Sequence, residues 1–156
     1  EIEFSAKLTG FAEQLFDGLT NFYDEQKGLF ASYLQKGAKI GYHEYTQAMV
    51  LLAAGDRLDK NVKERLVNAL ENPEGLTRIT LAGLPVKYEG LLKYAGRGAK
   101  EFVLNDCVKI FGGMLLSGAT SFWETAKGAA DFDEAGSLCH GWSSVACYVL
   151  DTVFGK

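Results

Sequence analysis

Carboxylates and aromatic rings gather between residues 117 and 136, and these residue types could do chemistry on a sugar. The stretch contains Trp123, Glu124, Asp131, Phe132, Asp133 and Glu134. Aromatic rings can cover the apolar C–H faces of a pyranose, and carboxylates can hydrogen-bond its hydroxyls or move protons. An acidic surface loop without a function has the same composition, so this observation alone leaves both interpretations open.

Apolar residues recur at helical spacing on both sides of this stretch, which predicts an all-α chain. The pattern favours six helices, over residues 4–22, 42–54, 59–72, 81–94, 99–116 and 137–154. Asp59 is expected to cap the third helix, Asn72-Pro73 to end it, and Pro85 to lie in the first turn of the fourth. Because most connections are short, neighbouring helices should be antiparallel and form three hairpins.

The connection over residues 117–136 is the exception to these short links. Loops of more than about 12 residues are uncommon in compact domains and are often functional. No strand-like alternation and no internal repeat is visible elsewhere, so residues 1–156 are expected to form one domain without a sheet.

Charge and hydropathy exclude two classes of partner. The net charge is −4 and no basic stretch stands out, whereas phosphate binding needs a concentrated positive surface, so nucleic acid is not expected as a partner. Apolar runs such as residues 48–54 are much shorter than the roughly 20 residues that cross a bilayer, so no membrane partner is expected. The chain does not begin with Met, and we expect a piece of a longer protein whose compartment stays unknown.

The three cysteines, Cys107, Cys139 and Cys147, are odd in number and lack metal-type spacing. This argues against a disulfide framework and against a zinc site. We expect all three to be small core residues.

Two stretches in and after the long loop resemble the end of the six-hairpin catalytic domain of bacterial α-L-rhamnosidases. The first is GATSFWET over residues 118–125, followed by GAADFD over residues 128–133. The second is GSLCHGWS over residues 136–143. Residues 45–49 (YTQAM) and 87–92 (KYEGLL) also look like segments upstream of this signature.

The resemblance implies a fold and a reaction. The fold is an (α/α)6 toroid around a sugar pocket, and the expected α-hairpins would form roughly half of it, the C-terminal half. The reaction is the inverting hydrolysis of terminal α-L-rhamnosides, with water as second substrate and no cofactor. The family's catalytic base lies in its tryptophan-glutamate motif, which falls here on Glu124. Its general acid comes from an earlier acidic motif without a counterpart in this chain, so the chain alone is expected to be inactive.

Further substrate-binding residues are expected in and after the loop. His140 should lie in the first turn of the last helix, where the resemblance implies that it lines the sugar site; the alternative is a structural histidine that supports the loop. Trp123 could form a wall of the pocket or pack under the loop. Asp131 and Asp133 could bind sugar hydroxyls or hold the loop through turn hydrogen bonds.

Two other candidates have ordinary structural alternatives. Trp142 falls on the apolar stripe of the last helix, which favours core packing over sugar binding. Tyr88 carries a weaker resemblance and could be an ordinary helix residue.

Two other functions remain open from sequence. Another glycosidase on the same toroid would differ in the sugar that it releases, because a fold does not determine chemistry. A non-catalytic helical carbohydrate-binding or interaction module would bind without turnover. The first and last hairpins of a half-toroid would expose apolar edges, so we also expect a homo-oligomer that forms through these edges.

Overall fold

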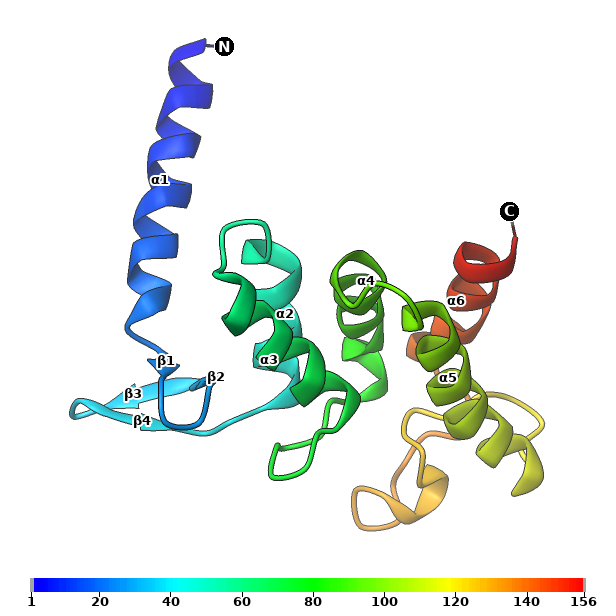
Figure 1. Cartoon of the computed structure of the whole chain (residues 1–156). Coiled ribbons are helices and arrows are strands. Elements are labelled where there is room, and N and C mark those ends of the chain that lie inside the picture. Colours follow the sequence, from blue (N-terminus) through cyan, green and yellow to red (C-terminus); the bar gives the residue numbers. More distant parts are fainter. Residues whose placement is uncertain (1, 156) are drawn as a thin grey trace.

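The computed structural model describes residues 2–155 and is predominantly helical (Figure 1). Helices, short 3-10 turns included, take 58% of the chain, which confirms the all-α prediction at this level. The α-helices are α1 (Ile2–Thr20), α2 (Glu44–Ala54), α3 (Lys60–Glu71), α4 (Leu84–Tyr94), α5 (Ala99–Leu116) and α6 (Val145–Phe154). Three 3-10 turns span Leu81–Gly83, Gly128–Ala130 and Gly141–Ser144.

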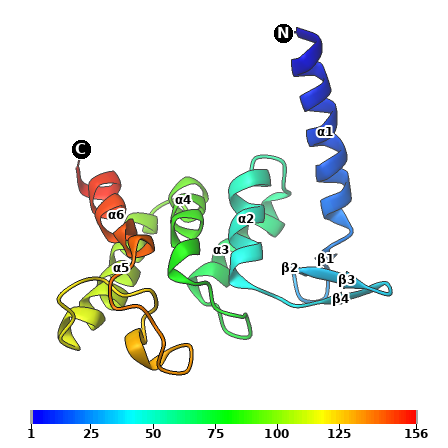
Figure 2. The same ribbon diagram turned by 180° about the vertical axis from the view of Figure 1, so that it is seen from behind.

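Helices α2, α4 and α6 lie side by side and run in one direction, while α3 and α5 run back between them (Figures 1 and 2). α2 packs against α3 and α4, and α5 packs against α4 and α6. Short connections produce this alternation of antiparallel neighbours. As a result, α2, α4 and α6 all begin at the lower end of the molecule in Figure 1, where the loops that precede them also lie.

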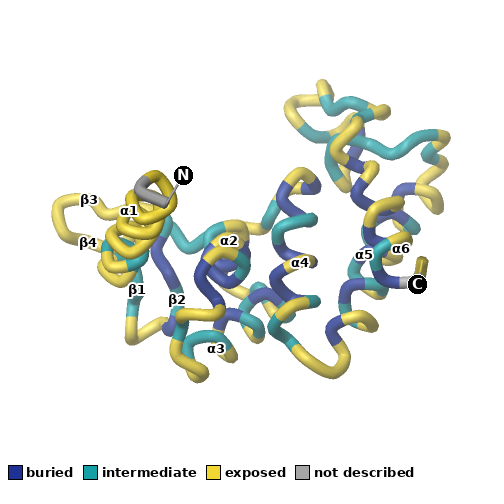
Figure 3. Tube along the Cα trace, turned by 90° about the horizontal axis from the view of Figure 1, so that it is seen from above, coloured by how far each residue is buried: buried dark blue, intermediate teal, exposed yellow. Residues whose placement is uncertain are grey.

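The apolar stripes of these five helices form one core, which Figure 3 shows along the inner sides of α2, α4, α5 and α6. Leucines of α2, α3 and α4 pack together, and α4 in turn packs against the buried side chains of α5 and α6. Its largest buried members include Leu51, Leu66, Leu70, Leu84, Leu91, Val103, Phe111, Met114, Val145 and Val149. Among the described residues, α1 has no buried member of this core and packs against it only through the half-buried Leu19.

Several predicted helix boundaries are confirmed. The carboxylate of Asp59 accepts a hydrogen bond from the Asn61 N–H at 2.8 Å and caps α3. Pro85 lies in the first turn of α4, and Asn72 ends α3. These positions carry local signals that do not depend on the rest of the fold, because caps act within one turn.

The predicted start of the last helix is wrong. α6 begins at Val145, because residues 141–144 form a 3-10 turn that His140 precedes. A 3-10 turn has 3.0 residues per turn, so it breaks the register of the stripe that continues in α6. Trp142, which was expected to face the core, is 53% exposed, and Leu138, before the turn, is 48% exposed.

The chain was expected to lack a sheet, and the structure departs from this expectation by small strand pairs alone within residues 2–155. Two small antiparallel hairpins fill the stretch before α2: β1 (Tyr23–Asp24) with β2 (Leu29–Phe30), and β3 (Tyr33–Gln35) with β4 (Ala38–Ile40). Lys36 and Gly37 both have positive φ, 50° and 82°, as a two-residue hairpin turn requires. Strands of two or three residues are too short for an alternating pattern to be recognised.

These hairpins separate α1 from α2, so the predicted hairpin of the first two helices does not form. Figures 1 and 2 show α1 standing apart from the other helices. Its apolar stripe is exposed: Phe4, Leu8, Phe11 and Leu15 are between 53% and 76% accessible. An ion pair of Arg57 with Glu13, and the Arg57 guanidinium 3.9 Å over the Phe16 ring, connect α1 to the α2–α3 turn.

The expectation for the cysteines holds for one of three. Cys107 is buried in the core, and burial raises the pKa of its thiol. Cys139 and Cys147 are exposed. Cys139 lies in the loop before α6, and Cys147 lies on the α6 face opposite the core stripe, so neither reaches the interior.

Candidate functional site

The two loop segments that carry the sequence signature lie side by side. The Glu124 N–H donates to the Ser137 carbonyl at 2.9 Å, and the His140 N–H donates to the Phe122 carbonyl at 3.0 Å. A third hydrogen bond joins the Ser121 hydroxyl to the Leu138 carbonyl at 2.6 Å. Residues 121–124 and 137–140 therefore run antiparallel, at the end where α2, α4 and α6 begin.

Glu124 is half-buried at one end of this pairing. One carboxylate oxygen, Oε2, accepts a hydrogen bond from the Ser137 N–H at 3.3 Å. Within residues 2–155 no hydrogen bond is found to its other oxygen. A carboxylate held by one oxygen can use the other to accept a proton from water, which is the work of a general base.

Trp123 packs under the loop. A Cβ placed on Gly128 would come within 2.6 Å of the Trp123 ring, so the glycine backbone lies directly against the indole. The ring also packs against the hydrophobic core. Of the two interpretations left open by the sequence, the geometry favours packing over a wall of the pocket.

Ser143 is a buried residue that the sequence did not single out. Its hydroxyl donates to the Trp123 carbonyl, and the side chain is fully buried. This bond connects the loop to the turn that precedes α6. A lone serine beside a helix start has no distinguishing sequence pattern, because its partner lies 20 residues away.

His140 precedes the 3-10 turn instead of lying inside a helix, which corrects the predicted location. Its Nδ1 accepts a hydrogen bond from the Trp142 N–H at 3.2 Å and so caps the turn. Since Nδ1 acts as acceptor, the neutral ring carries its proton on Nε2, which remains as a donor for a hydroxyl group. The same geometry also makes His140 a support for the loop.

The Trp142 ring lies on the surface, 4.5 Å from the His140 ring between centroids. Core packing, the favoured interpretation from sequence, is therefore wrong for this residue. The reason is the 3-10 turn described above. Its exposure leaves the indole accessible to a ligand at the start of α6.

The tip of the loop has an unusual backbone. Phe132, Asp133 and Glu134 are three consecutive non-glycine residues with positive φ, at 53°, 56° and 69°. Such conformations cost free energy and persist only where surrounding contacts impose them. Here the carbonyl of Asp131 accepts the N–H groups of Ala135 and Gly136 at 3.1 and 3.0 Å, which closes the turn.

These contacts favour different interpretations for the two aspartates. The Asp131 carboxylate accepts from the Phe132 N–H at 3.3 Å and lies 3.9 Å from the Lys127 ammonium, so it holds the loop. Asp133 is exposed at the tip, where it could reach a ligand or only solvent.

Tyr88, the weakest candidate, has no exposed surface. Its hydroxyl donates to Asp106 Oδ2 at 3.1 Å, and burial raises its pKa. Gln47, from the other upstream segment, is also fully buried; its amide exchanges hydrogen bonds with the Phe30 backbone at 2.9 and 2.8 Å. Both geometries favour structural roles within the helices.

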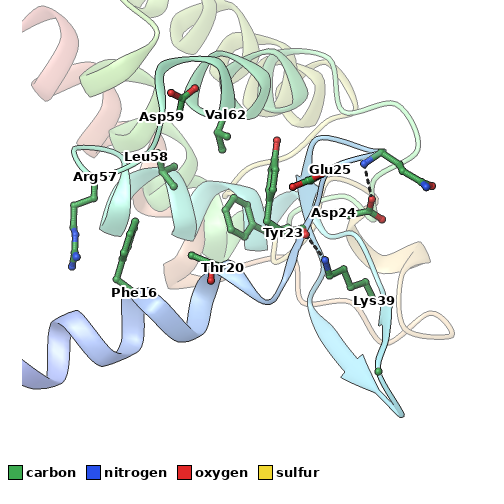
Figure 4. Close-up of a pocket in the computed structure, with 13 residues that line it drawn as sticks. Phe16, Thr20, Tyr23, Asp24, Glu25, Lys39, Arg57, Leu58, Asp59 and Val62 are labelled. Atoms are coloured by element: carbon green, nitrogen blue, oxygen red, sulfur yellow. Dashed lines mark hydrogen bonds between the residues drawn. The ribbon is translucent and has the colours of Figure 1, made fainter.

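A large cavity lies elsewhere in the described part of the chain. It has a volume of about 820 Å³ and opens between α1, the β-hairpins and the α2–α3 turn (Figure 4). None of the predicted site residues lines it. Asp24, on its wall, accepts the Tyr42 hydroxyl at 2.6 Å, which holds the pKa of that carboxyl below its usual value. Size alone therefore does not identify this cavity as the site, because the polar groups described there serve the local fold.

Comparisons with known proteins add no identity: no family model, curated protein or solved structure matches the chain. Within residues 2–155, no group of three or more His, Cys, Asp or Glu side chains could hold a metal ion. Over the same range, none of the helices has the length and apolar character needed to span a bilayer.

Proposed function

We propose that this chain is the C-terminal part of an (α/α)6 catalytic domain of an inverting glycoside hydrolase that acts on terminal α-L-rhamnosides. One observation carries the proposal. The two segments of the rhamnosidase-like signature, 121–124 and 137–140, are hydrogen-bonded side by side and bring Glu124 and His140 to the same end of the helices. The resemblance involves both segments, and a shared site requires them to meet.

The arrangement of the helices supports the toroid. In such a ring, parallel inner helices alternate with outer helices that return the chain. α2, α4 and α6 have the parallel relation of inner helices, and α3 and α5 have the position of returning ones. The proposed ring would be completed by hairpins that this chain does not contain.

In the proposed reaction, Glu124 takes a proton from a water molecule as that water attacks the anomeric carbon. The bond from water oxygen to carbon forms while the glycosidic C–O bond breaks on the opposite face. A general acid outside this chain protonates the leaving oxygen. The two carboxyl groups of inverting enzymes are about 6.5–9.5 Å apart, which leaves room for the water.

The test of this reaction is the identity and configuration of the released sugar. The protein that contains the complete domain is expected to release L-rhamnose from an α-L-rhamnoside, first as the β-anomer, because inversion requires it. Proton NMR during the first minutes reads the anomer, and chromatography identifies the sugar. A matched α-D-glucoside with the same aglycone is the control.

Three results would contradict parts of the proposal. Release of a different sugar would favour another glycosidase on the same fold. First appearance of the α-anomer would exclude inversion. Binding without turnover in any form of the protein, unaffected by Glu124→Ala, would favour the second candidate, a carbohydrate-binding module. The exposed Trp142 ring is the observation that supports this second candidate.

We also propose self-association through the exposed stripe of α1. Exposed contiguous apolar patches are rare on monomers, and two-fold pairing would cover this one. Because a two-fold pair contains Phe11 twice, Phe11→Glu should weaken association by at least about 10²-fold, from the roughly 1.5–3 kcal/mol that burial of each large apolar side chain contributes. Analytical ultracentrifugation measures the effect, and Gln14→Glu, on an exposed position of the same helix, is the control. A monomer at high concentration would remove this proposal.

A further inference from the structure

A second aromatic and acidic surface lies beside the loop. A groove of about 420 Å³ separates the beginning of α4 from the beginning of α6. Its lining includes Ala82, Pro85, Glu89, Trp142, Ser144 and Tyr148. This volume lies within the roughly 300–1,000 Å³ range of small-molecule sites.

Two rings and one carboxylate give the groove its chemistry. Trp142 and Tyr148 are 53% and 45% exposed, so both rings can be covered by a ligand. The Tyr148 hydroxyl donates to Glu89 Oε1 at 2.7 Å and joins α6 to α4 across the groove. That bond raises the pKa of Tyr148, so its hydroxyl stays protonated and keeps donating at neutral pH.

The bond holds the Glu89 carboxylate in place and leaves part of its capacity to accept hydrogen bonds unused. A carboxylate has about four acceptor positions, and Tyr148 occupies one of them. Glu89 is exposed, and no cation is paired with it among residues 2–155. The carboxylate can therefore accept further hydrogen bonds from hydroxyl groups of a ligand.

The groove also adjoins the proposed catalytic loop. Ser144 lines the groove, and its neighbour Ser143 donates to the carbonyl of Trp123. Trp123 directly precedes Glu124. A ligand in the groove would thus contact the turn that holds the loop.

We propose that this groove is a sugar-binding subsite, with Glu89 as its hydrogen-bond acceptor and Trp142 as its stacking platform. The inference rests on the proposed function, from which it takes sugars as the class of ligand. It adds that the sugar is neutral. The ligand is a neutral pyranose: its apolar face covers the indole and its hydroxyls donate to Glu89. An acidic sugar is disfavoured, because its carboxylate would meet that of Glu89 with no cation between them.

The test measures binding by this chain of methyl α-L-rhamnoside, with D-galacturonate as the charged comparison, by ligand-observed NMR. Glu89→Gln and Trp142→Ala are each expected to weaken binding of the neutral sugar by about tenfold, since a hydrogen bond to a charged acceptor and an exposed stacking ring are lost. Tyr148→Phe should weaken it less, because the carboxylate remains. All three altered side chains are exposed, and circular dichroism checks that the fold persists.

Glu101→Gln, an exposed carboxylate of α5, is the matched control and should bind as the original chain does. The inference is overturned if no binding of the neutral sugar is detected, if Glu89→Gln and Trp142→Ala leave it unchanged, or if galacturonate binds equally well. The Glu124→Gln variant separates the two proposals. It should keep sugar binding by this chain while it lowers turnover in the complete domain, so a failure of the groove proposal and a failure of the proposed reaction give different results.

Discussion

Replacement of Glu124 by glutamine in the complete hydrolase is expected to lower turnover by about 10²–10⁴-fold, the usual contribution of a general base. Substrate binding should remain close to that of the original enzyme. The carboxamide keeps the shape of the side chain, and its oxygen can still accept the Ser137 N–H that holds Glu124 Oε2 at 3.3 Å. Only the capacity to take a proton is lost, so steady-state kinetics should show a fall in kcat with little change in KM.

A second measurement separates a base from a residue that only holds the loop. In Glu124→Ala, added azide can attack the anomeric carbon without losing a proton, so a glycosyl azide product and restored turnover are expected. A purely structural role for Glu124 predicts no such rescue. Glu134→Gln, an exposed carboxylate of the same loop, is the control and should keep full activity. Unchanged turnover in Glu124→Gln would show that another residue is the base.

The second large effect concerns stability and a buried ion pair. The Lys87 ammonium is 1% exposed and lies 2.7 Å from Glu44 Oε1 and 3.3 Å from Asp106 Oδ2. Lys87→Met should lower the free energy of unfolding by about 3–5 kcal/mol, because Glu44 would keep a buried charge without its closest partner. Urea denaturation followed by circular dichroism measures the change.

The same helix supplies the control. Lys93 pairs with Asp56 at 2.7 Å, but the two side chains are 50% and 72% exposed. Lys93→Met should therefore cost less than about 1 kcal/mol, as is usual for exposed pairs. Glu44→Gln combined with Lys87→Met should recover part of the loss, since the remaining amide can still accept the Ile79 N–H that now lies 2.9 Å from Glu44 Oε2. Equal costs for the two lysine variants would contradict this account.

The sequence predicted those features of the fold that depend on neighbouring residues. The Asp59 cap, Pro85 in the first turn and the extent of α5 follow from signals within one or two turns. The strands between residues 23 and 40 were not predicted, because two or three residues carry no measurable alternation of apolar and polar side chains. The start of α6 was predicted too early, because the apolar stripe continues into residues that form a 3-10 turn.

The residues of the candidate site were also predicted only in part. Glu124 and His140 were expected together from the resemblance, and backbone hydrogen bonds bring their segments together. Ser143, Glu89 and Tyr148 were missed. Their partners lie 20 and 59 residues away, and no periodicity or spacing within a single chain segment reports such contacts.

The common end of α2, α4 and α6 has a consequence for how such a protein can change during evolution. The buried stripes lie along the helices, while the residues proposed to contact a ligand lie in the loops before the helices and at exposed positions of their first two turns. Substitutions in the loop over residues 117–140 can therefore alter which molecule is recognised without entering the leucine-rich interior. Exposed positions such as Asp133 and Trp142 are free to diverge in this sense, whereas Ser143 and Gly128 are constrained by the contacts that hold the loop in place. Selection for new specificity and selection for stability would thus act on largely separate sets of residues.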